Sequence, residues 1–261
     1  MTTTPKKRVL LILGIFVLTI GVLFVSAYIF YDQPLPLGHQ GKDAEKLAEM
    51  MEQSVGLENW KETGAIEWTF ADSINHLWDR KRNFARVRWD ENEVLLDLGT
   101  RQGIAFAQGR RVGKGEDAGL IEKAYSLWAN DSFWLNPIAK LRDQGVSLQA
   151  VELENSEEDS HKQGLLVTYG SGGVTPGDSY LWILAPGGRP LKWRMWVSIT
   201  PVGGLEASFE GWQKLDTGAL VSTLHRLPLG LKLRLSNIRA AKDLSSLAPG
   251  GDPFQPLVLI E

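Results

Sequence analysis

The run AIEWTFADSINHLWDRKRNFARVRWDENEVLLDLGTRQGIAF, residues 65–106, carries the pattern that decides the fold. Ile66, Trp68 and Phe70 alternate here with polar residues, a period of two that is typical of strands with one buried face. The alternation recurs at residues 85–89, 94–98 and 104–106, and turn-forming residues separate the runs at 71–73, 79–83, 90–92 and 99–103. Short strands joined by tight turns predict an antiparallel meander.

A second series of strands follows a helical insert. Its runs lie at residues 151–153, 165–169, 180–184, 191–197, 205–209 and 231–235. The sequence also predicts an amphipathic helix from Asp43 to Gly56, a helix over residues 116–128, and a short helix that starts at Pro137 after Asn136. About ten strands with so few helices predict a mainly β (α+β) fold, an antiparallel sheet that curves and is covered by helices.

Upstream of the meander, residues 9–31 read VLLILGIFVLTIGVLFVSAYIFY and contain no charged residue. A helix of this length reaches about 35 Å, which is enough to cross a hydrocarbon core about 30 Å thick. Three basic residues at positions 6–8 precede it, so the positive-inside bias predicts a cytoplasmic tail and an extracytoplasmic C-terminal domain. The alternative is a signal peptide cleaved after Val25-Ser26-Ala27, but the apolar run is longer than a usual signal core. We therefore expect one transmembrane anchor in the inner (cytoplasmic) membrane.

Composition narrows the function. The 261-residue chain contains no cysteine, so it can form no disulfide and carry no lipid on an N-terminal cysteine, a usage that suits a bacterial periplasm. All 31 acidic residues follow Tyr31, but three of the 28 basic ones precede residue 9, so residues 32–261 carry a formal charge of −6. Nucleic-acid-binding domains are normally basic, and this class is therefore set aside.

The order of elements is anchor, amphipathic helix, strands, helical insert and second strands. Together with Leu57-Glu-Asn-Trp60 and Asn130-Asp-Ser-Phe-Trp-Leu135, it resembles the LolA/LolB-like superfamily of lipoprotein carriers and receptors, over about residues 43–240. The stretches 172–182 and 194–196 are similar to uncharacterised members. The resemblance implies an open half-barrel whose apolar concave face, covered by helices, holds acyl chains. This chain departs from the family in its uncleaved anchor and its lack of a lipidated cysteine, so the expected regions are a tail (1–8), an anchor (9–31), a linker (32–42) and the half-barrel domain (43–261).

Aromatic residues are the strongest candidates for a ligand site, because each large ring can bury about 150–250 Å². They either fill the core of a large sheet or line a cavity for an apolar ligand. Trp196 and Trp212 lie among polar positions and are the candidates least suited to a simple core role. The full set of cavity candidates is Trp68, Phe70, Trp78, Trp89, Phe106, Trp128, Phe133, Trp134, Trp182, Trp193, Trp196 and Trp212.

Other constellations are weaker. A basic group, either a solvated face or a contact for lipid phosphates or an anionic partner, comprises Arg80, Lys81, Arg82, Arg86, Arg88, Arg110, Arg111 and Lys114. The histidines show no metal-ligand spacing, with His76 and Asp79 the nearest approach to one, so we expect no metal and no cofactor. Ser171 lacks the first glycine of a nucleophile elbow, and no sequence pattern pairs Asp131 with Asp178, so we expect no enzyme.

The sequence thus predicts a membrane-anchored, extracytoplasmic binding protein that holds a lipid, lipoprotein acyl chains or another apolar ligand. A structural or protein-interaction module of a cell-envelope complex, with a self-filled core, is the alternative. A hydrolase with carboxylates in its loops is a third hypothesis, which a convergent pair of perturbed acids in a cleft would support.

Overall fold

The computed structural model describes residues 12–16, 18–19, 21, 26, 32–153, 163–171, 176–200 and 202–258. The expected anchor at 9–31 lies mostly outside these residues, and its described positions are helical. Within the described residues, no helix has both the length and the apolar character needed to cross a membrane. The anchor therefore stays a prediction.

The first meander forms the middle of an eight-stranded antiparallel sheet with the order β14-β15-β1-β2-β3-β4-β5-β6. Its strands are β1 (Ala65–Phe70), β2 (Ile74–Asp79), β3 (Phe84–Trp89), β4 (Asn92–Asp97), β5 (Gln102–Ala107), β6 (Arg110–Arg111), β14 (Leu224–Arg226) and β15 (Lys232–Ala241). The β1–β2 turn places Ala71 and Asp72 at positive φ, the backbone of the hairpin turn that matches strand twist. The predicted alternation is confirmed, since Ile66 and Trp68 are buried on one face while Glu67 faces the other way.

A second antiparallel sheet has the order β11-β10-β9-β8-β7, and a separate two-stranded ribbon packs against the first sheet through Val221. The strands of the second sheet are β7 (Val146–Val151), β8 (Gln163–Tyr169), β9 (Ser179–Leu184), β10 (Pro190–Trp196) and β11 (Leu205–Ser208), and the ribbon is β12 (Gln213–Lys214) with β13 (Leu220–Val221). The two large sheets meet at β11 and β14, where His225 Nδ1 donates to the Ser208 carbonyl oxygen at 2.8 Å. Both sheets stay open rather than closing into one barrel.

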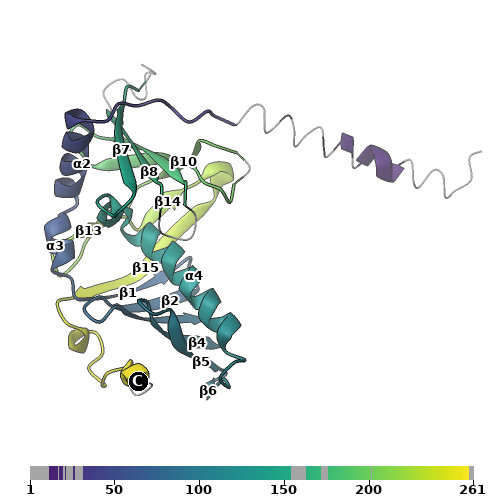
Figure 1. Cartoon of the computed structure of the whole chain (residues 1–261), viewed down its shortest axis with the longest axis vertical. Coiled ribbons are helices and arrows are strands. Elements are labelled where there is room, and N and C mark those ends of the chain that lie inside the picture. Colours follow the sequence, from purple (N-terminus) through teal and green to yellow (C-terminus); the bar gives the residue numbers. More distant parts are fainter. Residues whose placement is uncertain are drawn as a thin grey trace, which may run out of the picture.

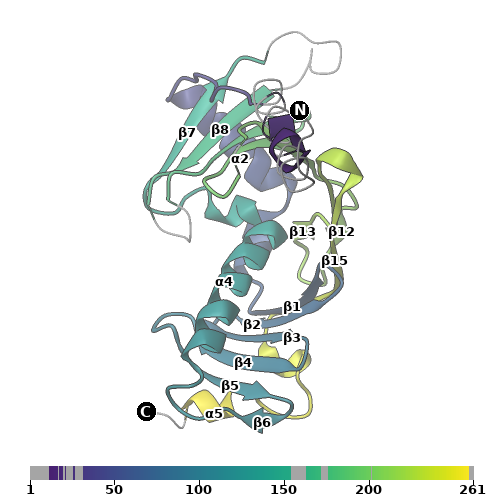
Figure 2. The same cartoon turned by 90° about the vertical axis from the view of Figure 1, so that its right-hand side faces the viewer.

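The described helices lie on both sides of the sheets, with α2, α3 and α4 on the inner faces and α5 on an outer face. They are α2 (Lys42–Ser54), α3 (Leu57–Lys61), α4 (Ala118–Leu135) and α5 (Gln255–Val258), with 3-10 turns η1 (Pro137–Lys140), η2 (Pro228–Gly230) and η3 (Leu244–Ser246). The buried stripe of α2 packs on the second sheet. Figures 1 and 2 show α4 running from the second sheet down along the first, while α5 lies on the opposite face of the first sheet.

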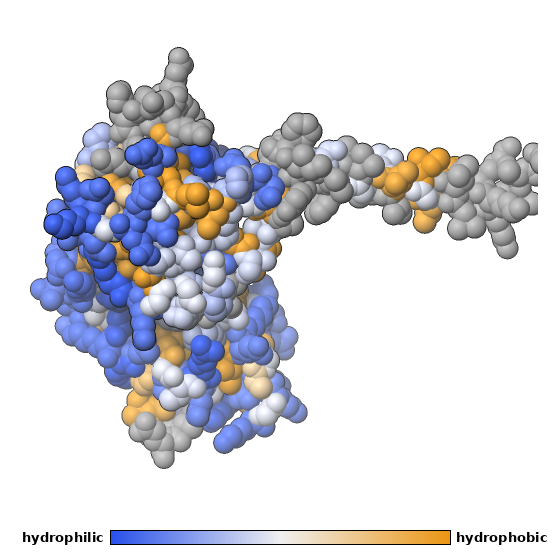
Figure 3. Space-filling model, turned by 45° about the horizontal axis from the view of Figure 1, so that its top comes forward, coloured by the Kyte–Doolittle hydropathy of each residue, from blue (hydrophilic) through white to orange (hydrophobic). Residues whose placement is uncertain are grey.

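The described chain differs from the predicted one in several details. It contains short strands that the sequence pattern missed, because β6, β12, β13 and β14 have only two or three residues, and β2 lacks clear alternation because it includes polar Asn75 and His76. The run predicted at 151–153 is instead a strand that ends at Val151, β7. It also continues α4 through Asn130 to Leu135, since Asp131 finds a buried partner and does not have to end the helix. The mainly β, open architecture itself is as predicted, and the face of the molecule seen in Figure 3 is mostly hydrophilic with smaller apolar patches.

Candidate functional site

The inner faces of the two sheets meet in an aromatic interior beneath α4. We use this name for Trp68, Trp78, Trp128, Phe133, Trp134, Trp182 and Trp193. They come from β1, β2, α4, β9 and β10 and belong to three adjoining clusters, which share Trp78, Trp128 and Trp134. Phe70, Trp89 and Trp212 lie at its borders on the same inner side. Most of the aromatic residues that the sequence suggested as cavity candidates therefore lie on the inner side of the two sheets.

Two predicted candidates lie elsewhere. Phe106 is on the outer face of the first sheet, in a cluster with Phe254 and Leu257 of the C-terminal segment. Trp196 is on the outer face of the second sheet, where its Nε1 donates to the Gln33 carbonyl oxygen at 2.7 Å. Both follow from strand alternation, because each lies one position out of phase with the inward residues of its strand.

Trp193 lies at the centre of the part of the aromatic interior that packs on the second sheet. Its ring is fully buried and lies 4.9 Å from Trp134 and 4.9 Å from Trp182, both edge-on, and 5.8 Å from Phe133, nearly parallel. Edge-to-face and offset-stacked pairs of this kind add stability beyond their buried area. In the described conformation these side chains fill the space, and a neighbouring cavity between α4 and β13 has a volume of only about 10 Å³.

Several polar atoms inside this cluster have no partner. In the described part of the chain, the buried Nε1 atoms of Trp68, Trp78, Trp128, Trp182 and Trp193 make no hydrogen bond. A buried donor without a partner costs about 1–3 kcal/mol, and native interiors keep such donors few. The aromatic interior therefore combines apolar surface with free hydrogen-bond donors.

A buried polar pair joins α4 to the first sheet. His76 Nε2 lies 2.6 Å from Asp131 Oδ2, and both side chains are almost completely buried. The imidazole also stacks on Trp68 with ring centroids 4.4 Å apart, and Asn130 Nδ2 donates to the second oxygen of Asp131 at 2.9 Å. The sequence predicted neither partner, since the residues are 55 positions apart.

The weaker sequence candidates separate in space. Asp79 accepts from Arg82 Nε at 2.6 Å rather than joining His76, and Asp178 accepts from the Ser198 amide at 2.9 Å rather than joining Asp131. Among the described residues, no group of three or more His, Asp or Glu side chains is placed to hold a metal ion.

His225 lies beside the aromatic interior, where the two sheets meet. Its ring packs 5.0 Å from Trp134 and 4.7 Å from Phe209. Burial lowers its pKa to about 4, so the imidazole is neutral at pH 7, and the Ser208 carbonyl fixes the proton on Nδ1. Nε2 then faces apolar surroundings without a partner in the described chain.

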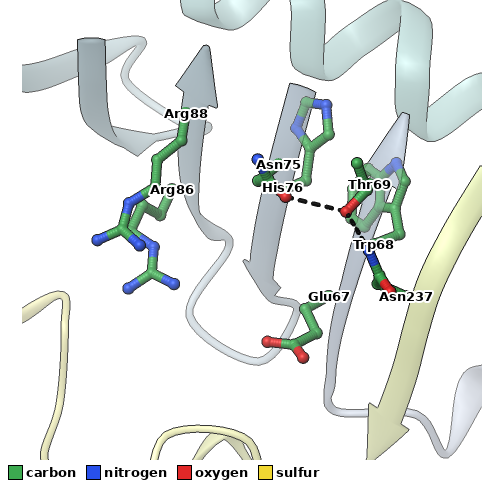
Figure 4. Close-up of a pocket in the computed structure, with 8 residues that line it drawn as sticks. All are labelled: Glu67, Trp68, Thr69, Asn75, His76, Arg86, Arg88 and Asn237. Carbon is green, nitrogen blue, oxygen red and sulfur yellow. Dashed lines mark hydrogen bonds between the residues drawn. The ribbon is translucent and has the colours of Figure 1, made fainter. Parts of the chain in front are cut away.

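A separate hollow of about 380 Å³ opens on the outer face of the first sheet (Figure 4). It is lined by Glu67, Trp68, Thr69, Asn75, His76, Arg86, Arg88 and Asn237. Figure 4 shows Arg86 and Arg88 side by side on the open side of the strands, whereas His76 points the other way, toward a helix. Two of the basic residues singled out in the sequence thus line a defined concavity. Arg80, in contrast, turns toward the carbonyl oxygens of Trp60 and Thr63.

Comparisons with known proteins give weak structural similarity at low sequence identity. No family model and no curated protein matches the chain. Similar solved structures include a DUF1329 family protein from Desulfovibrio piger ATCC 29098, with a TM-score of 0.40, 10% identity, and coverage of 77% of this chain and 94% of that one. They also include a putative outer membrane lipoprotein-sorting protein domain from Vibrio parahaemolyticus, with a TM-score of 0.34, 10% identity, and coverage of 84% of this chain and all of the other.

Proposed function

We propose that the domain is an extracytoplasmic binding protein, held at the inner membrane by residues 9–31, whose aromatic interior takes an acyl chain or a similar apolar ligand. The observation that carries the proposal is the set of unpartnered indole N–H groups within an otherwise apolar cluster. The rings would pack against a hydrocarbon body, and an ester or amide carbonyl of the ligand would accept from the indoles.

Entry of such a ligand needs a movable cover, and α4 has the features of one. Along its 18 residues only Ala124, Asp131, Ser132 and Leu135 are fully buried. Its C-terminal half carries Trp128, Phe133 and Trp134, which pack against both sheets. A shift of this helix would therefore expose the aromatic interior on the side of each sheet. The buried His76–Asp131 pair would act as the latch that holds α4 closed.

The linker gives the domain a fixed approach to the proposed membrane anchor. Gly203 N donates to Asp32 Oδ1 at 2.8 Å, and Gln33 N donates to the Gly203 carbonyl at 3.2 Å. Further along, His39 pairs with Ala150 of β7. These contacts support a placement in which the second sheet, rather than the first, lies nearest the bilayer.

A self-filled interaction module is the second candidate, and the small size of the inner cavity, about 10 Å³, favours it. In that case edge-to-face neighbours such as Trp182 and Trp193 would be the partial acceptors of the indole N–H groups. A hydrolase is less well supported, because Asp131 and Asp178 do not converge and the buried His76–Asp131 pair has no access to a substrate in the described state.

Titration with a brominated long-chain fatty acid tests the proposal. The full-length chain, exchanged from detergent into a lipid-free amphipol, should show saturable quenching of tryptophan fluorescence. Trp193→Phe keeps an aromatic ring but removes one donor and should weaken binding several-fold, whereas Trp196→Phe, on the outer face, should bind as the wild type does. Quenching that rises linearly without saturation, or an equal loss in both variants, would favour the self-filled module.

A further inference from the structure

The hollow on the outer face of the first sheet has a construction of its own. Cross-strand pairing places Thr69, Asn75 and Arg88 in one row across β1, β2 and β3, and Glu67, Leu77 and Arg86 in the next row. The C-terminal segment covers the neighbouring apolar side chains, including Leu77, through Phe254 and Leu257. The polar part of the two rows is left as the concavity of about 380 Å³.

Arg86 is the unusual residue of this hollow. On the strands that flank β3 it stands opposite Leu77 and Leu95, both buried, and its own side chain is half-buried. Among the described residues its guanidinium makes no hydrogen bond and no ion pair. Burial lowers the pKa of Arg86 and the charge of Arg88 lowers it further, while the carboxylates of Glu93 and Glu67 raise it in part. An arginine kept charged in such a place favours an anion that supplies the missing acceptors.

Other donors converge on the same space. Arg88 uses Nε to hold Glu93, and its two terminal nitrogens have no partner in the described chain. Asn237 Nδ2 donates to Thr69 Oγ1 at 3.1 Å, and Thr69 Oγ1 donates to Asn75 Oδ1 at 2.9 Å (Figure 4). Because the oxygen of Asn75 is occupied, its amide nitrogen is the group left free to donate.

The charge balance also favours an anion. Glu67 is paired with Arg239 and Glu93 with Arg88, so both carboxylates are neutralised by their own arginine. Among the described residues Arg86 makes no ion pair of its own, and the carboxylates of Glu67 and Glu93 act on it only from a distance. Donors from three side chains suit a tetrahedral oxyanion with several oxygens better than a planar carboxylate with two.

We propose that this hollow binds a phosphate group, carried by a free phosphate compound or by a lipid headgroup, with Arg86 as the principal ligand and Arg88 and Asn75 as supporting donors. The volume exceeds that of a phosphate alone and leaves room for the group esterified to it. The donors Arg86, Arg88 and Asn75 lie on the face of the sheet opposite the aromatic interior, and Trp68 is the residue that the two sites share. The proposal does not rest on the binding function proposed for that interior.

Calorimetric titration of the full-length chain in a neutral maltoside detergent tests the proposal and separates the two sources. One arm uses sodium phosphate and the other uses dioctanoyl phosphatidylglycerol below its micellar concentration, each against sodium chloride of equal ionic strength. Saturable binding of phosphate would assign a free phosphate compound, and saturable binding of the lipid alone would assign a headgroup. No saturable binding in either arm would overturn the proposal.

Matched arginine variants decide whether Arg86 is the ligand. Arg86→Gln should weaken binding at least about tenfold, whereas Arg110→Gln, an exposed arginine on β6 of the same sheet, should leave it unchanged. Arg86→Gln leaves no carboxylate unpaired, so it should melt at the wild-type temperature, and the ligand should raise that temperature in the wild type only. Asn75→Ala, an exposed site, is the second variant and should weaken binding less. Equal losses in Arg86→Gln and Arg110→Gln would refute the assignment.

Discussion

Removal of Asp131 should show how firmly α4 is fixed to the first sheet. Asp131→Ala takes away the partner of His76 Nε2, an atom 2.6 Å away in a side chain with no exposed surface. His76 Nδ1 already has no partner in the described chain, so the whole imidazole would be left buried without a hydrogen bond. Breaking a buried pair by removal of one member costs about 3–5 kcal/mol, and we expect a loss of this size in the free energy of unfolding.

Urea unfolding followed by tryptophan fluorescence measures this loss in the full-length chain. The control is Asp143→Ala, which removes an exposed ion pair with Lys140 at 3.4 Å and should cost less than about 1 kcal/mol. The double variant His76→Phe with Asp131→Leu replaces the pair by apolar groups and keeps a ring on Trp68, so it should recover most of the lost stability.

The reasoning would be refuted if the free energy of unfolding of Asp131→Ala lay within about 1 kcal/mol of the wild-type value, because a buried imidazole without a hydrogen bond should destabilise the protein by more than that. The single variants His76→Phe and Asp131→Leu complete the comparison. If the double variant loses as much free energy of unfolding as these two single variants added together, packing rather than the lost hydrogen bond sets the cost, and the reasoning is contradicted.

Three further predictions follow from single positions. Trp193→Ala removes the fully buried ring at the centre of the part of the aromatic interior that packs on the second sheet and should lower the free energy of unfolding by about 3–5 kcal/mol in the same urea assay. Burial lowers the pKa of His225 from 6.5 to about 4, so between these two pH values the unfolded chain binds a proton that the folded chain does not. The free energy of unfolding should therefore fall by up to about 3 kcal/mol as the pH drops from 6.5 to 4, and by less in His225→Phe. Urea unfolding at several pH values measures this difference. Gly188 has φ of +80° and a Cβ there would lie 2.5 Å from the backbone of Met50, so Gly188→Ala should lower the melting temperature, whereas Gly187→Ala, with open space around it, should not.

The sequence predicted the strands best where alternation was long and undisturbed. The strands at residues 65–70 and 84–89 could be predicted because every second residue there is apolar, which marks the buried face. The alternation is broken at β2, whose inward position 76 holds a histidine. A histidine is acceptable there only because a carboxylate 55 residues later lies against it, and no local pattern records such a partner.

The candidate site divides in the same way. Alternation showed which aromatic residues share a face of each strand, and it put Trp196 among polar positions. It did not show which face of β5 is the inner one, or that Trp134 of α4 and Trp193 of β10 would meet. The unpartnered indole donors could not have been predicted, because whether an N–H finds an acceptor depends on neighbours from other elements.

By itself, the sequence determined the strand-rich architecture, the acidic and cysteine-free outer domain, and an apolar N-terminal segment long enough for an anchor. These are properties of composition and of residue spacing along the chain, so they can be inferred without knowledge of the fold. Only the tertiary structure decided that the strands divide into two sheets, that His76 meets Asp131, and that Arg86 stands without a partner in a polar hollow. Each of these depends on contacts between residues far apart in the chain, where packing and pairing, rather than periodicity, choose the neighbours.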